Sequence, residues 1–141
     1  MKENPAKGQR LRILVAEPLP SMTQLTRAML EADGHEVHCA TTLEALETRA
    51  AARCLDAVVL DPVITGAGGF ALLAGIAGRA GAPVVAVSAN GSIAQAVAAM
   101  RAGAAVYLVK PVSRDRLQAA LEIAVTAARA TSGLGGAQPA Q

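Results

Sequence analysis

Four polar residues follow four short apolar runs, and their chemical types suit phosphoryl chemistry. They are Glu17, Asp61, Ser88 and Lys110. A carboxylate can attack phosphorus to form an acyl phosphate, and an ammonium group offers a compact positive charge to phosphate oxygens. A hydroxyl can donate a hydrogen bond to the same group. A second carboxylate can help to hold the Mg²⁺ that offsets the charge of the reacting anions.

Each of these residues, taken alone, has a plainer interpretation. An aspartate at the end of a strand usually caps a helix or a turn, a lysine there is usually solvated, and Ser88 before "ANG" can cap the next helix. The phosphoryl site is favoured because all four residues fall at predicted strand ends.

Apolar runs of strand length alternate along the chain with segments of helical period. The predicted strands are residues 12–16, 36–40, 56–61, 83–88 and 105–110. Three of them are nearly continuous Val, Leu and Ala, which is typical of strands buried on both faces of a parallel sheet. The predicted helices cover about 21–33, start at a Thr41–Glu44 capping box, start near Gly69, cover 92–102, and start at a Ser113 cap.

This alternation predicts an α/β fold of the flavodoxin-like class. It is a doubly wound, five-stranded parallel sheet in the order 2-1-3-4-5 with five helices. Ligands of such sheets bind beyond the carboxyl ends of the strands, at the switch point between the first and third. The four polar residues would meet there.

The composition limits the classes of function. The 141 residues are 52% hydrophobic, with one Tyr, one Phe and no Trp, and the 13 basic residues are scattered with a net charge of +2. Few aromatic residues and no basic stripe argue against direct binding of nucleic acid. Cys39 and Cys54 lack metal-ligand spacing, so we interpret them as small hydrophobic residues.

The ends of the chain differ from its middle. Residues 1–10 are polar without the apolar core of a signal peptide, and residues 131–141 are rich in Gly without helical period. We expect both ends to be disordered, the second as a tail or linker, around one domain over residues 11–130. No run is long and apolar enough for a membrane span, so a soluble, cytoplasmic protein without membrane contact is expected.

Three segments resemble the receiver domains of two-component response regulators over roughly residues 11–130. "DAVVLDPVITGAGGF" resembles the phosphoacceptor segment, with Asp61 in the acceptor place and Gly66 and Gly69 in the following loop. "PVVAVSANGS" resembles the fourth strand with its hydroxyl residue, Ser88. "AMRAGAAVYLVKP" resembles the segment that carries the family's lysine, Lys110.

The resemblance implies roles for particular residues and partners. Asp61 would accept a phosphoryl group from a histidine kinase or phosphotransfer protein, with Ser88 and Lys110 assisting. Ser88 and Tyr107 would be switch residues, Pro111 would follow a cis peptide bond, and Mg²⁺ would bind Glu17, Asp61 and the Val63 carbonyl. The face of the fourth helix, fifth strand and fifth helix would contact a downstream protein or output domain. The chain itself would be a monomer or weak dimer and no enzyme.

The first strand departs from the family pattern. The family usually ends it with two adjacent acids, and here Glu17 takes the first place and Pro18 the second. The second acid normally contacts Mg²⁺, which proline cannot do, so weakened metal binding is expected because Mg²⁺ tolerates poor geometry badly. Thr65 and Gly68 replace the usual proline and acid of the loop after Asp61.

Three hypotheses remain open from the sequence. The first is a signalling domain switched by phosphorylation of Asp61. The second, suggested by Pro18, is a pseudo-receiver that docks on proteins without phosphorylation. The third is an enzyme of another flavodoxin-like family, which the lack of G-x-G-x-x-G and Walker A sequences disfavours. Only Phe70 and Tyr107 are available to stack on a flavin.

Overall fold

The computed structural model describes residues 9–52 and 54–137 of the chain. The elements are β1 (Arg12–Ala16), α1 (Pro20–Ala32), β2 (Glu36–Ala40), α2 (Leu43–Ala52), β3 (Ala57–Leu60), η1 (Pro62–Leu72), α3 (Leu73–Ala80), β4 (Val84–Ser88), α4 (Ile93–Arg101), β5 (Val106–Val109) and α5 (Arg114–Ala137). All strand pairs are parallel, in the order β2-β1-β3-β4-β5, which confirms the predicted fold.

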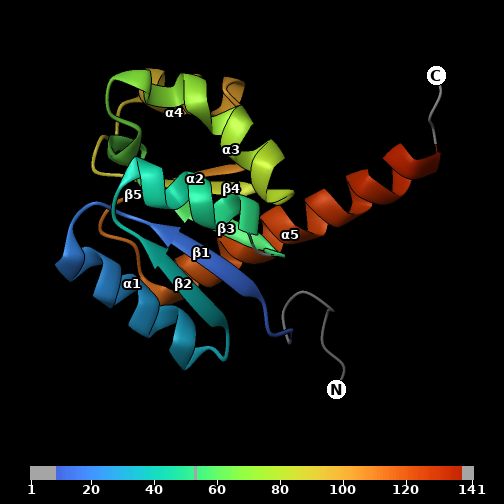
Figure 1. Cartoon of the computed structure of the whole chain (residues 1–141), viewed down its shortest axis with the longest axis horizontal. Coiled ribbons are helices and arrows are strands. Elements are labelled where there is room, and N and C mark those ends of the chain that lie inside the picture. Colours follow the sequence, from blue (N-terminus) through green and yellow to red (C-terminus); the bar gives the residue numbers. More distant parts are fainter. Residues whose placement is uncertain (1–8, 53, 138–141) are drawn as a thin grey trace.

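Helices cover both faces of the sheet (Figure 1). Successive residues of β1 point to opposite faces, so Ile13 and Val15 pack with α1 and α5, whereas Leu14 and Ala16 pack with α2, α3 and α4. Both sets are buried, which explains why the central strands read as continuous apolar runs.

The second helix begins one residue later than a Thr41 cap requires. The hydroxyl of Thr42 accepts the N–H of Ala45 at 3.1 Å, and α2 starts at Leu43. The predicted Thr41–Glu44 capping box is therefore wrong. The cap at Ser113 is confirmed, since its hydroxyl accepts the N–H of Arg116 at 3.2 Å.

The segment after β3 is less regular than the helix predicted from Gly69. It forms the 3₁₀ segment η1, and the α-helix α3 starts only at Leu73. Gly66 and Gly69 interrupt η1 with φ of 60° and 55°, a conformation that favours glycine. The stretch Pro62–Ala80 is apolar and long enough to suggest a membrane span, but it is not one continuous α-helix.

The last helix is longer than expected. It continues to Ala137, and its C-terminal part extends beyond the body of the domain in Figure 1. A formed helix propagates more easily than it nucleates, and the first proline that would interrupt it is Pro139. Disorder was expected for residues 1–10 and 131–141, and of these, residues 1–8 and 138–141 lie outside the described residues.

Candidate functional site

The sheet places Glu17 and Asp61 side by side. Ala16 of β1 pairs with Leu60 of β3, and each acid directly follows its strand. The ladder continues past this pair, because the N–H of Asp61 donates to the Ala16 carbonyl at 2.9 Å. Both carboxylates therefore lie at the carboxyl edge of adjacent strands.

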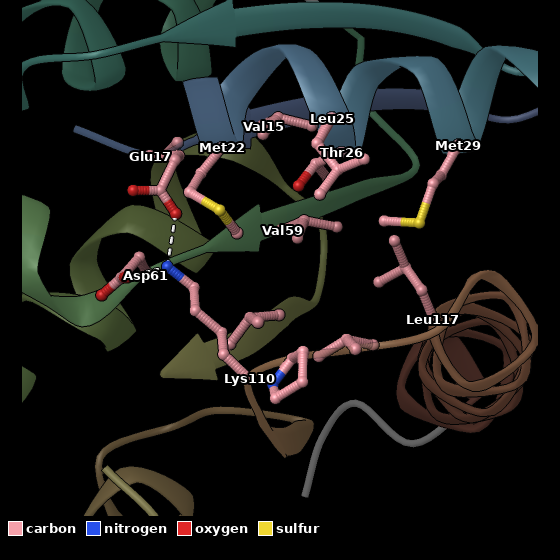
Figure 2. Close-up of a pocket in the computed structure, with 14 residues that line it drawn as sticks. Val15, Glu17, Met22, Leu25, Thr26, Met29, Val59, Asp61, Lys110 and Leu117 are labelled. Carbon is pink, nitrogen blue, oxygen red and sulfur yellow. Dashed lines mark hydrogen bonds and ion pairs between the residues drawn. The ribbon is translucent and has the colours of Figure 1, made fainter. Parts of the chain in front are cut away.

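Lys110 joins the two carboxylates from the end of β5. Its Nζ lies 2.7 Å from Glu17 Oε1 and 2.5 Å from Asp61 Oδ2. Figure 2 shows the three side chains converging. Glu17 and Asp61 are only 5% and 6% exposed. We call these three side chains the ionic triad; its formal charge is −1.

The remaining carboxylate oxygens are held by backbone N–H groups. Glu17 Oε2 accepts the N–H of Leu19 at 3.1 Å, and Asp61 Oδ1 accepts the N–H of Val63 at 2.9 Å. Each acid is followed by a proline, which has no N–H, so the nearest following donor is two residues on. Every carboxylate oxygen of the triad thus has a protein partner.

Two opposing effects act on the Lys110 ammonium. Burial lowers the pKa of Lys110, but hydrogen bonds to Asp61 and Glu17 and their negative charges raise it, and the net direction is upward. The ammonium form is therefore stabilised at neutral pH. The following peptide bond, Lys110–Pro111, is cis.

Ser88 and Tyr107 form a second group beside the triad. The N–H of Asn90 donates to Ser88 Oγ at 3.0 Å, and the Tyr107 hydroxyl donates to the carbonyl of Asn90 at 2.7 Å. Asn90 Oδ1 accepts the N–H of Ser92, the residue that caps α4. The Ser88 carbonyl accepts the backbone N–H of Lys110 at 2.8 Å, but the Ser88 hydroxyl has no hydrogen bond to a side chain of the triad.

Asn90 is the site residue that sequence reasoning missed. Its backbone links both predicted switch residues, and its side chain links them to the start of α4. The available signal was its position in "SANGS", because asparagine readily bonds backbone groups two residues on.

The triad opens onto a cavity of about 70 Å³ between α1 and the start of α5. Figure 2 shows Met22 and Met29 of α1 on one side and Leu117 of α5 on another. The walls are mainly apolar, whereas Glu17, Asp61 and Lys110 line the polar end.

The donors fit a Mg²⁺ ion that one or two carboxylates hold together with water. Glu17 and Asp61 supply carboxylate oxygens, but within the described residues no group of three His, Cys, Asp or Glu side chains is arranged to hold a metal. Pro18 contributes no oxygen from its side chain.

A doubly wound sheet in this strand order, with two buried carboxylates and an ammonium group beyond the carboxyl ends of its strands, defines the flavodoxin-like fold with a polar site at its switch point. The sequence model of one protein family, the response regulator receiver domain, matches residues 13–122 of this chain. The chain therefore belongs to this family.

The relatives include longer transcriptional regulators. TcrA of Mycobacterium tuberculosis strain H37Rv is 35% identical over 79% of this chain and 44% of its own length. KdpE of Escherichia coli K12 is 32% identical over 85% of this chain and 53% of its own. The chain thus spans about half of these curated relatives. The expectation of no direct nucleic-acid contact does not fit the full-length relatives, since both are named transcriptional regulatory proteins.

Solved structures share the fold. NtrX from Brucella abortus has a TM-score of 0.81 and 28% identity, over 92% of this chain and 30% of that one. A response regulator protein from Burkholderia pseudomallei, described with a phosphorylated aspartic acid, a calcium ion and citrate, has a TM-score of 0.74 and 25% identity. It covers 88% of this chain and 74% of its own.

Proposed function

We propose that this domain accepts a phosphoryl group on Asp61 from a histidine kinase or a histidine phosphotransfer protein. The observation that carries the proposal is the buried Asp61 carboxylate held against the Lys110 ammonium at 2.5 Å. The phosphorylated aspartic acid named for the Burkholderia pseudomallei relative supports the same chemistry.

The transfer needs few protein groups. An oxygen of Asp61 forms a bond to phosphorus while the bond between phosphorus and the donor histidine nitrogen breaks, and that nitrogen keeps the electron pair. Lys110 stays close enough to neutralise the added phosphoryl oxygens. Mg²⁺ would be held by Glu17 and Asp61, and, as the family resemblance implies, by the Val63 carbonyl. It would supply further positive charge to the transferred group.

The response to phosphorylation passes through Asn90. Ser88 Oγ accepts the N–H of Asn90 at 3.0 Å, and a change of the Ser88 rotamer that brings Oγ to a phosphoryl group would move it away from that N–H. The Tyr107 hydroxyl and the Ser92 cap bond the same residue, so the start of α4 shifts with it. Ile93, Val97 and Met100 give the exposed face of α4 an apolar surface for a downstream protein or output domain.

Intact mass spectrometry after incubation with acetyl phosphate and Mg²⁺ tests this function. The wild-type domain gains the mass of one phosphoryl group. An unchanged mass with acetyl phosphate and with a phosphorylated histidine kinase would refute the proposal.

A second candidate, docking without phosphorylation, is favoured by Pro18 and by the full set of partners on the carboxylate oxygens. In that case Asp61→Asn keeps partner binding and signalling output undiminished. A variant that loses both excludes it.

The setting of the domain follows from the same proposal. The domain, residues 11–130, works in the cytoplasm as a monomer or weak dimer. It signals to a partner and is not itself an enzyme.

A further inference from the structure

Two triplets of the same chemical type flank Lys110. They are residues 17–19, Glu-Pro-Leu, and residues 61–63, Asp-Pro-Val. In each, the acid follows a parallel strand of the sheet, the proline has no N–H, and the third residue is a largely exposed aliphatic one. Leu19 is 57% exposed and Val63 70%.

The hydrogen bonds of the two acids match. Each carboxylate gives one oxygen to the same Lys110 Nζ, at 2.7 Å for Glu17 and 2.5 Å for Asp61. Each gives its other oxygen to the N–H two residues later, at 3.1 Å and 2.9 Å. Both acids are more than nine-tenths buried and line the same cavity. Glu17 and Asp61 therefore have nearly the same electrostatic environment.

The reactivity of a carboxylate toward phosphorus depends on its charge, its access and the cation that neutralises the incoming group. These properties are shared by both acids, and no other carboxylate among the described residues contacts Lys110. We propose that Glu17 is a second phosphoacceptor of the pocket, which takes the phosphoryl group when Asp61 cannot. This inference rests on the proposed function, because it assumes that the pocket admits a phosphoryl donor.

The step balances without a further reactant. With acetyl phosphate, an oxygen of the Glu17 carboxylate forms the new bond to phosphorus, and the bond between phosphorus and the acetate oxygen breaks. Acetate leaves with the electron pair. The product is a glutamyl phosphate beside Lys110.

The pocket holds one phosphoryl group at a time. Phosphorylation at both acids would place two multiply charged anions against the single ammonium of Lys110. Two anions that contact the same ammonium lie close together and repel each other strongly. Whichever acid reacts, the other stays paired with Lys110. The wild type is therefore expected to gain the mass of one phosphoryl group and not of two.

The experiment uses acetyl phosphate and Mg²⁺ on the wild type and on three variants, Asp61→Asn, Glu17→Gln and the double variant. Borohydride then reduces any acyl phosphate to an alcohol, and peptide mass mapping locates the reduced residue. We expect reduced Glu17 in Asp61→Asn, reduced Asp61 in Glu17→Gln, and no reduced acid in the double variant. Asp61→Ala repeats the first measurement if circular dichroism shows that Asp61→Asn is unfolded.

Asp56 provides a matched control. Its carboxylate also accepts a backbone N–H, that of Arg12, and pairs with the cation Arg129, but it does not contact Lys110. Adding Asp56→Asn to Asp61→Asn should leave the reduced Glu17 unchanged.

Two outcomes separate this inference from the proposed function. A wild type reduced at Asp61 together with a folded Asp61→Asn that shows no reduced Glu17 overturns the inference and leaves the function standing. A wild type with no modification overturns both.

Discussion

At the scale of single residues, Lys110 is the cation that makes two buried carboxylates compatible. Without Lys110, the buried carboxylates of Glu17 and Asp61 would lie together as two negative charges with no cation to compensate them, and burying such uncompensated charges destabilises the fold. The positions of these residues at strand ends could be predicted from the sequence. Their backbone partners at Leu19 and Val63 could not, because these bonds depend on how the chain turns after Pro18 and Pro62.

Replacing Lys110 by Met should lower the free energy of unfolding by about 3–5 kcal/mol at neutral pH, since two buried carboxylates lose their cationic partner. The pKa of Lys110 is raised above 10.5, so its stabilisation is fully present below that pH and is lost as pH rises through the raised value. Urea unfolding at several pH values measures this. A difference between the two proteins that persists undiminished at strongly alkaline pH would contradict the account.

At the scale of elements, strands were more predictable than helix starts. Strands buried on both faces leave an unbroken apolar run, as in Val84–Ser88, so their ends are visible in the sequence. The start of α2 was misplaced because Thr41 and Thr42 are both good caps, and only the backbone geometry selects Thr42. The irregular start of α3 depends on the conformations of Gly66 and Gly69, which the helical period does not report.

The two threonines permit a paired test of the α2 cap. Thr42→Ala should lower the free energy of unfolding by about 1 kcal/mol, because it removes the acceptor of the Ala45 N–H. Thr41→Ala, one residue outside the cap, should change it by less than about 0.5 kcal/mol. Equal effects in thermal denaturation would show that Thr42 is not the cap.

At the scale of the whole molecule, polar and apolar contacts attach α5 to the connection between α1 and β2 and to the sheet. Arg114 pairs with Asp33 at 3.0 Å, and Gln118 bonds the buried His35 at 2.9 Å. Leu117 and Leu121 bury the apolar side of the helix against the sheet. The base of α5 is thus held firmly, whereas its C-terminal part extends past the domain (Figure 1).

Two residues of α5 test this attachment. Leu121→Ala, at a fully buried position, should cost about 2–5 kcal/mol of stability through the cavity it leaves. Ile123→Ala is the control, because Ile123 is 62% exposed, and it should cost less than about 1 kcal/mol. Similar midpoints for both variants in urea denaturation would contradict the packing described.

The measurement that tests the central claim most directly is the phosphorylated fraction of the domain against Mg²⁺ concentration, read by intact mass with acetyl phosphate as donor. The wild type should be phosphorylated to one group per chain. Pro18→Asp should reach the same fraction at about tenfold lower Mg²⁺, because a further carboxylate near the triad strengthens its attraction for a divalent ion. Coincident Mg²⁺ curves would contradict the role given to Pro18, and a wild type that stays unmodified at every Mg²⁺ concentration would contradict the phosphoacceptor role of Asp61.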